Sequence, residues 1–199
     1  MAEAQGELLS YEDGVRAVEL ARESVESYVL NGQREQPGSM RDAFYQRTGA
    51  QVRIESITGR LRGCAGSYES NDQLGHSIVE AAISAASADS CGSELEAAEL
   101  QDVRLSVCGV AEVVLTDNPL DDLEIGVHGV AVDGRGEHGW MYPTIPLDNG
   151  WSAPEYLDRT CRKAGLAPDA WMADEVMVTL FRGQVFRERA PGSDVEELQ

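Results

Sequence analysis

The chain has 199 residues, of which 42% are hydrophobic, and a formal net charge of −19 at pH 7. This length predicts one compact domain, or one domain with a smaller lobe, and the hydrophobic content excludes a fully disordered chain. No apolar run approaches the roughly 18 residues that a membrane-spanning helix needs. The first residues lack the basic start and apolar stretch of a secretory signal, so we expect a cytoplasmic protein without membrane association.

The charge balance indicates adaptation to high salt. Asp and Glu total 35 against 16 Lys plus Arg, and Lys163 is the only lysine. At molar salt the Debye length is about 3 Å, so the repulsion among carboxylates is largely screened. The alternative is an ordinary acidic protein. The four cysteines (Cys64, Cys91, Cys108 and Cys161) are far apart and form no C-x-x-C pair, so we expect reduced thiols.

Capping signals and hydrophobic periodicity place the elements of the first half. The capping-box sequence Ser10-Tyr-Glu-Asp13 opens a predicted helix over residues 11–31, and Gly32 follows its end. Residues 50–57 alternate apolar and polar, which is typical of a half-buried strand, and residues 60–64 form a second short strand. Another helix is predicted over residues 72–88.

The second half is predicted to be richer in strands. One strand covers residues 103–108, and residues 113–115 continue it or pair with it. A strand over 125–132 leads to a hairpin partner around 140–142. A capping box at Ser152 and Glu155 opens a helix that Gly165 ends. The last strand, 176–181, is expected to turn at Gly183 into residues 185–186.

These elements predict the α+β class. Strands and helices are mixed, several strand links are short, and no β-α-β repeat is regular, which favours a mainly antiparallel sheet with packed helices over a doubly wound parallel sheet. The predicted domain spans residues 10–188. Residues 189–199 are expected to form an acidic, mobile tail.

Cys64 is the first candidate for chemistry. Along a strand, residues 60, 62 and 64 point to the same face, so Arg60 and Arg62 could share a surface with the sulfur. Nearby guanidinium charge favours the thiolate, which is the reactive form of cysteine. The alternative is a small buried thiol at a strand end.

His128 is the second candidate, because it lies between Gly126 and Gly129 in an otherwise apolar segment. It could act as a base or a ligand, and the alternative is a hydrogen-bonded core histidine. No His, Cys, Asp or Glu grouping has metal-ligand spacing, so no metal site is predicted. Basic residues form no stripe, which makes nucleic-acid binding the least favoured function.

Five segments resemble the AMMECR family, in the family's order. Leu61-Arg-Gly-Cys64 followed by Gly66 is similar to its L-R-G-C-I-G signature, and residues 125–130 (IGVHGV) to its I-G-x-H-G-I strand. Residues 142–151 (YPTIPLDNGW) resemble its L-P-Q-V-P segment ending in tryptophan. Residues 161–171 and 186–188 resemble its C-x-K-A-G-L…W and F-x-E endings. The similarity covers about residues 10–188.

Three positions depart from the family pattern. Ala65 replaces the usual isoleucine after the cysteine, and Thr144 stands where the family has glutamine. The family's D-P-R-F-like stretch appears here only as Asp89-Ser-Cys91-Gly92. If the missing arginine and glutamine help to form the family's cleft, the ligand or the reaction differs here or is absent.

The resemblance implies an α+β fold with a smaller lobe, and a cleft near the L-R-G-C segment. It also implies an association with Memo-like and radical S-adenosylmethionine proteins; it names no cofactor. On this basis Arg62 would hold an anion and Cys64 would supply a thiolate. Leu61, Gly63 and Gly66 would complete the segment, and His128, Thr144 and Lys163 would be neighbours in the cleft.

Two functions follow from these observations. In the first, the chain is a cleft domain centred on Arg62 and Cys64 that binds a small or modified ligand, with thiol-dependent chemistry. In the second, it is a non-catalytic adaptor for a Memo-like or radical S-adenosylmethionine partner. The rate at which Cys64 reacts with a thiol reagent distinguishes the two.

Overall fold

The computed structural model describes residues 9–37, 41–87 and 93–198. Its helices are α1 (Tyr11–Asn31), α2 (Leu74–Ala86), α3 (Pro119–Asp122), α4 (Thr144–Asn149) and α5 (Ala153–Lys163). Its strands are β1 (Ala50–Ser56), β2 (Leu61–Ser67), β3 (Val103–Thr116), β4 (His128–Gly134), β5 (Glu137–Met141), β6 (Val176–Glu188) and β7 (Val195–Leu198). The stretch around Cys91 lies outside the described residues.

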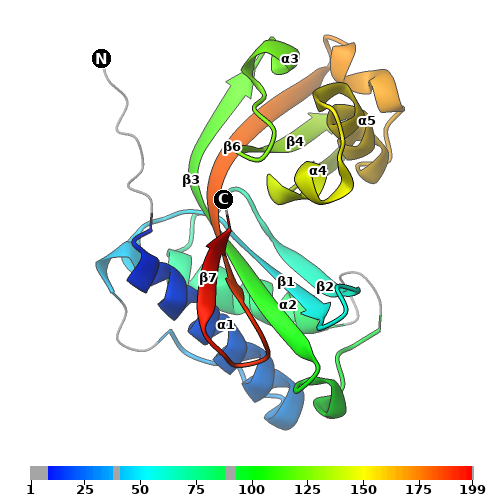
Figure 1. The fold of residues 1–199 in the computed structure, drawn as a ribbon. Helices are drawn as coiled ribbons and strands as arrows, with labels where there is room; N and C mark the ends of the chain where they lie inside the picture. The colour runs from blue at the N-terminus through cyan, green and yellow to red at the C-terminus, as the bar shows by residue number, and fades with distance from the viewer. Residues whose placement is uncertain (1–8, 38–40, 88–92, 199) are drawn as a thin grey trace. The chain divides into compact units, whose positions relative to one another are not determined.

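The strands follow the hydrogen-bonded order β2-β1-β3-β6-β4-β5, and β7 pairs with β6 (Figure 1). The pairs β1–β2, β1–β3, β4–β5, β4–β6 and β6–β7 are antiparallel. The predicted α+β class with a mainly antiparallel sheet is therefore confirmed. The chain divides into two compact units, a larger one from Glu7–Val110 with Gln184–Leu198 and a smaller one from Ala111–Gly183. Strands β3 and β6 each contribute residues to both units.

In the larger unit, α1 and α2 cover one face of the sheet (Figure 1). Ser10 caps α1 by accepting the N–H of Asp13, and Gly32 ends it with a φ of 63°. The core includes apolar side chains from α1, α2, β1 and β3. Phe186 of β6 reaches the same core and lies over Gly14, where a Cβ would overlap the phenyl ring.

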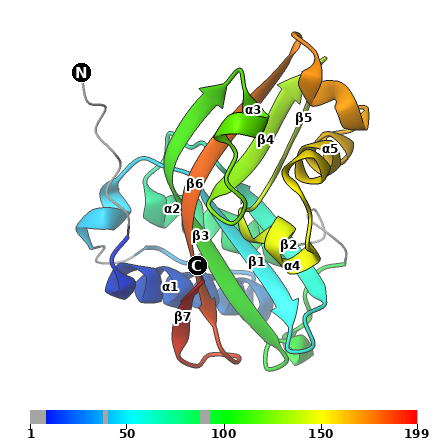
Figure 2. The same cartoon turned by 45° about the horizontal axis from the view of Figure 1, so that its top comes forward.

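In the smaller unit, α5 packs beside the β4–β5 hairpin and the first part of β6 (Figure 2). The predicted capping box of Ser152 and Glu155 is present, with the side chain of each bonded to the backbone of the other. The inner face of α5 buries Tyr156, Leu157 and Cys161 against β4 and β6. Alternating strand residues and one helix face thus build a second core.

Strand β3 is continuous to Thr116, which confirms the first of the two predicted alternatives for residues 113–115. Other boundaries differ from the sequence-based predictions. Strand β6 runs through Gly183 to Glu188 without the predicted turn. Strand β4 begins only at His128, because residues 125–127 form a turn around Gly126, whose φ is 87°. The segment expected to be a mobile tail contains β7, which pairs with β6 along residues 195–198. No helix among the described residues is long and apolar enough to cross a membrane.

Candidate functional site

The L-R-G-C segment lies on β2, and the strand register places three of its residues in rows across β1 and β3. Leu61 is level with Glu55 and Arg104, Cys64 with Arg53 and Ser106, and Gly66 with Gln51 and Cys108. Their neighbours on β1 (Ala50, Val52 and Ile54) belong to the core under the helices. Because side chains alternate along a strand, these rows occupy the opposite face. We call Gln51, Arg53, Glu55, Cys64, Arg104, Ser106 and Cys108 the polar face.

The polar face is more buried than its composition predicts. Gln51 is 2% exposed, and Glu55 and Ser106 are each 8% exposed. Burying a polar group is costly unless it is hydrogen-bonded. The alternation in residues 50–57 predicted a polar side facing water, so the sequence alone did not mark Gln51 or Arg53 as part of a site. A signal in the sequence that could have marked this face is the pair of opposite charges at Arg53 and Glu55, which are two residues apart and therefore on the same side of the strand.

Cys64 is half-buried, and its sulfur accepts a hydrogen bond from Gln51 Nε2 at 3.3 Å. Arg53 is level with Cys64 on the neighbouring strand, where paired Cβ atoms are about 4.5–5.5 Å apart. The other described cysteines are deeper. Burial raises the pKa of the Cys108 thiol to about 12 and also raises the pKa of Cys161.

Arg62 has a different partner from the one predicted. Its Nε and Nη2 donate to the two carboxylate oxygens of Glu99 at 2.6 and 2.8 Å. This pairing lowers the pKa of Glu99 to about 2. A register shift between Ile54 and Glu55 in the β1–β2 pairing falls beside Arg62, which is the extra residue of a bulge. The carboxylate-binding edge of this guanidinium is therefore already occupied.

The structure explains why small residues occupy positions 63, 65 and 66 of this segment. Gly63 is buried and level with Ile54, and Ala65 is level with Val52 and packs against the core. Gly66 has a φ of 137°, and a Cβ there would overlap the carbonyl oxygen of Ala50. Gly66 also lines a small pocket of about 240 Å³ whose other lining residues include four serines, Ser67, Ser70, Ser77 and Ser84.

The other predicted site residues (His128, Thr144 and Lys163) belong to the smaller unit. His128 Nδ1 accepts the N–H of Glu124 at 3.0 Å, so the neutral ring carries its proton on Nε2. Burial, and then the positive charge of Arg182, lower the pKa of His128. The imidazole is thus neutral at neutral pH, and the lone pair that a base would use closes a local turn.

Lys163 and Thr144 hold different positions in this unit. Lys163 Nζ donates to the carbonyl of Trp140 at 2.7 Å and lies 5.4 Å from the centre of its ring. Thr144 is half-buried at the start of α4. Sequence reasoning missed Tyr156, whose buried hydroxyl lies 2.7 Å from the carbonyl oxygen of Tyr142 and 3.5 Å from that of His128. Tyr156 therefore joins the histidine segment to the segment that precedes Thr144.

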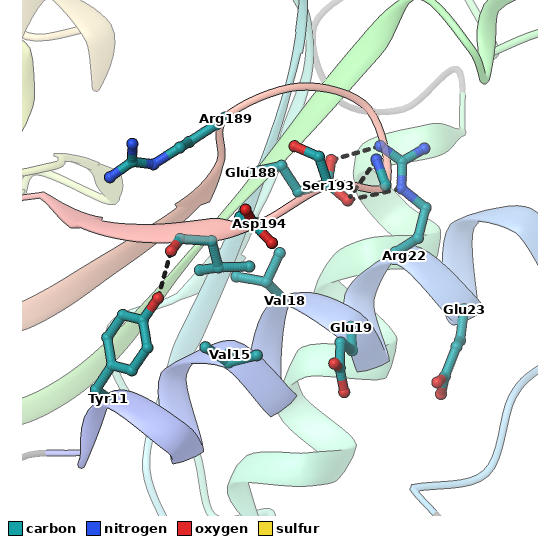
Figure 3. Close-up of a pocket in the computed structure, with 12 residues that line it drawn as sticks. Tyr11, Val15, Val18, Glu19, Arg22, Glu23, Glu188, Arg189, Ser193 and Asp194 are labelled. Carbon is teal, nitrogen blue, oxygen red and sulfur yellow. Dashed lines mark hydrogen bonds and ion pairs between the residues drawn. The ribbon is translucent and has the colours of Figure 1, made fainter.

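A pocket of about 750 Å³ lies between α1 and the turn that links β6 to β7 (Figure 3). Arg22 and Glu188 form one wall, with Arg22 Nε and Nη2 bonded to the two carboxylate oxygens at 2.9 and 2.5 Å. Arg22 also donates to the carbonyls of Leu100 and Val103, and Glu188 accepts the N–H of Leu105. Because Arg22 and Glu188 have hydrogen-bond partners within the protein, we assign this wall of the pocket a role in holding the fold together, not in binding a ligand.

No cluster of three or more His, Cys, Asp or Glu side chains with metal-binding geometry occurs in the described parts of the chain. The polar face itself carries the half-buried thiol of Cys64, the amide of Gln51 and the guanidinium groups of Arg53 and Arg104.

Comparison with known proteins gives a consistent result. A model of the AMMECR1 protein family matches residues 18–186. A protein of Halobacterium salinarum is 64% identical, across 100% of this chain and 99% of its own length. A Methanopyrus kandleri protein is 34% identical, across 96% of each chain. The crystal structure of the uncharacterized protein PH0010 from Pyrococcus horikoshii superposes with a TM-score of 0.89 at 26% identity, covering 96% of this chain and 98% of that one.

Proposed function

The chain belongs to the AMMECR1 family, and we propose that it is a ligand-binding protein whose site is the polar face around Cys64. The observation that carries this proposal is the Gln51–Cys64 contact. Gln51 is almost fully buried, yet its Oε1 has no hydrogen-bond partner among the described residues. A buried acceptor without a partner costs about 1–3 kcal/mol, which a bound donor group would offset.

Arg53, rather than Arg62, has the predicted role of holding the ligand. Arg62 is held by Glu99 on two of its nitrogens, whereas the Nε of Arg53 is buried without a hydrogen-bond partner among the described residues. Arg53 is also the residue level with Cys64. We therefore assign the contact with a ligand to Cys64, Gln51 and Arg53, in a protein that works in the cytoplasm at high salt.

Alkylation with iodoacetamide at the working salt concentration tests this assignment. Peptide mapping by mass spectrometry follows each thiol separately, in a Cys91→Ser background that removes the one cysteine outside the described residues. We expect Cys64 to react at least about tenfold faster than Cys108 and Cys161, because those two thiols are buried. If Cys64 reacts no faster than they do, the polar face is not an accessible site and the proposal fails.

A second candidate function is the adaptor. Val113 and Leu115, which alternation places on the same face of β3, are 39% and 60% exposed, and neighbouring exposed apolar side chains of this kind can form a docking surface. The occupant we propose is a Memo-like or radical S-adenosylmethionine protein. The affinity-tagged protein should recover such a partner from its own lysate, at a salt concentration that keeps the protein folded. Leu115→Glu should lose the partner, while Met177→Glu, at a similarly exposed strand position, should not. Recovery of no such protein would exclude this function.

A further inference from the structure

Three neighbouring strands of the larger unit each carry an arginine on the face opposite the helices. Arg53 is on β1, Arg104 on β3 and Arg187 on β6. Each is next in sequence to a side chain of the helix-covered core (Ile54, Leu105 and Phe186), so each points to the other face. Their side chains are 19%, 23% and 26% exposed. We call these three residues the arginine row.

Two carboxylates lie within the arginine row. Glu55 contacts Arg53 at 2.5 Å and Arg104 at 3.5 Å, and Glu196 of β7 contacts Arg187 at 2.7 Å. Arg187, with smaller contributions from Arg189 and Arg104, holds the pKa of Glu196 below its usual value, so the middle arginine of the row also acts on this carboxylate. Three guanidinium groups thus face two carboxylates, a local positive excess in a chain of net charge −19.

The arginine row also has unused donors. The Nε atoms of Arg53, Arg104 and Arg187 are buried, and none has a hydrogen-bond partner among the described residues, so a ligand would reach them only if these partly exposed side chains reoriented. A guanidinium Nε–H beside an Nη–H is the donor pair that binds oxyanions. An arrangement serving only as an internal ion network would be expected to satisfy such donors.

The spacing of the row favours an extended anion. Strands β1, β3 and β6 are adjacent, and the bond from Leu105 N to Glu188 at 2.8 Å keeps the end of β6 beside Arg104. Neighbouring strands are about 4.8 Å apart, so the backbones of β1 and β6 are about 10 Å apart. Arg104 is level with Glu55, so it is also offset from Arg53 by two residues along the strands. A single carboxylate can meet one guanidinium fork, whereas two linked phosphate groups present oxygens to several.

We propose that the arginine row binds a small diphosphate-bearing anion, which is the ligand of the polar face. This inference rests on the proposed function and adds the class of ligand to it. Arg53 and Arg104 belong to both sets, and Arg53 is level with Cys64, so a diphosphate on the row lies next to Cys64. The free diphosphate and the diphosphate of a nucleotide share this chemistry.

Titration calorimetry with inorganic pyrophosphate, at fixed KCl concentration, tests the inference. We expect binding to the unaltered chain and at least tenfold weaker binding to Arg104→Gln. Arg135→Gln is the matched control, because it removes the same charge from an exposed ion pair in the smaller unit. Arg187→Gln serves as a second variant if Arg104→Gln is unfolded by circular dichroism. Titration with ADP distinguishes a nucleotide from free diphosphate, and either one binding through the row supports the inference.

Protection of Cys64 from iodoacetamide separates this inference from the function on which it rests. Pyrophosphate at saturation should slow alkylation of Cys64 several-fold. If Cys64 reacts readily but pyrophosphate and ADP neither bind nor protect it, the diphosphate class is wrong and the polar face remains the site. Equal weakening by Arg104→Gln and Arg135→Gln would mean general charge attraction and would also overturn the inference. If Cys64 is alkylated no faster than Cys108 and Cys161, the proposed function itself is wrong.

Discussion

Arg22 of α1 and Glu188 of β6 form a buried two-point ion pair between residues 166 positions apart in the chain. Their side chains are 10% and 3% exposed, and both make further hydrogen bonds to the backbone of β3 and of the segment before it. The pair thus joins a helix to two strands. The F-x-E ending of the sequence has a structural explanation here, since Phe186 fills the core and Glu188 binds Arg22.

Removing one partner of this pair should destabilise the fold strongly. Arg22→Met leaves the buried Glu188 carboxylate without its cation, and we expect a loss of about 3–5 kcal/mol in the free energy of unfolding. Denaturant titration at fixed KCl measures it. Arg16→Met, which breaks the exposed pair with Glu23, is the control and should cost less than about 1 kcal/mol. Equal effects of the two variants would contradict the structural role of the buried pair.

The contact between Gly14 and Phe186 predicts a helix position where alanine is harmful. Gly14→Ala should gain about 1 kcal/mol of helix propensity, but its Cβ would overlap the Phe186 ring. We expect a net loss of about 1–3 kcal/mol by denaturant titration, as for other overpacked cores. In a Phe186→Leu background the same substitution should cost less. A stabilising Gly14→Ala would show that the two elements can separate freely.

The Arg62–Glu99 pair predicts a dependence of stability on pH. The pKa of Glu99 is about 2 in the folded chain, below its usual value of 4.5. Its contribution is therefore present above pH 4.5 and is lost as the pH falls towards 2. Because Glu99 is partly exposed, we expect only about 1 kcal/mol. Arg62→Gln should remove most of this loss between pH 6 and pH 2.5, whereas Arg60→Gln, whose charge is a minor influence on Glu99, should leave it largely intact.

The Gln51–Cys64 hydrogen bond predicts a change in thiol reactivity without a loss of stability. A donor to the sulfur favours the thiolate, so Gln51→Leu should slow alkylation of Cys64 several-fold at pH 8. It also removes the buried Oε1 that has no partner, so the free energy of unfolding should not fall. Gln184→Leu is the control, because Gln184 has a similar buried Oε1 but bonds to Glu197. Faster alkylation in Gln51→Leu would argue that the glutamine shields the sulfur.

The local elements could be predicted from the sequence, and the contacts between distant elements could not. Ser10, Gly32 and the Ser152–Glu155 box act over a few residues, and the helices that they bound lie within two residues of their predicted positions. Gly183 predicts a turn, yet pairing with β4 keeps the chain extended near it. The turn propensity of glycine is overridden there by hydrogen bonds to a strand that is distant in the sequence.

The candidate site shows the same limit. Strand alternation placed Arg53 and Glu55 on one face, but it cannot tell whether that face meets water or is covered. It gave Arg62 the same face as Cys64, and the bulge beside Arg62 and the carboxylate of Glu99, 37 residues away, could not be foreseen. The family motifs located Cys64 correctly on β2. They did not indicate Gln51, which is level with Gly66 and bonds to the sulfur.

The solitary lysine has a practical consequence for anyone who labels or cross-links this molecule. Lys163 already donates to the carbonyl of Trp140 and lies against its indole ring. Lys163 is therefore the only side chain that reagents for primary amines can modify. It lies in the smaller unit, and its amine is partly shielded by Trp140. Distance restraints across the larger unit will have to come from coupling its abundant carboxylates or from maleimides placed at introduced cysteines.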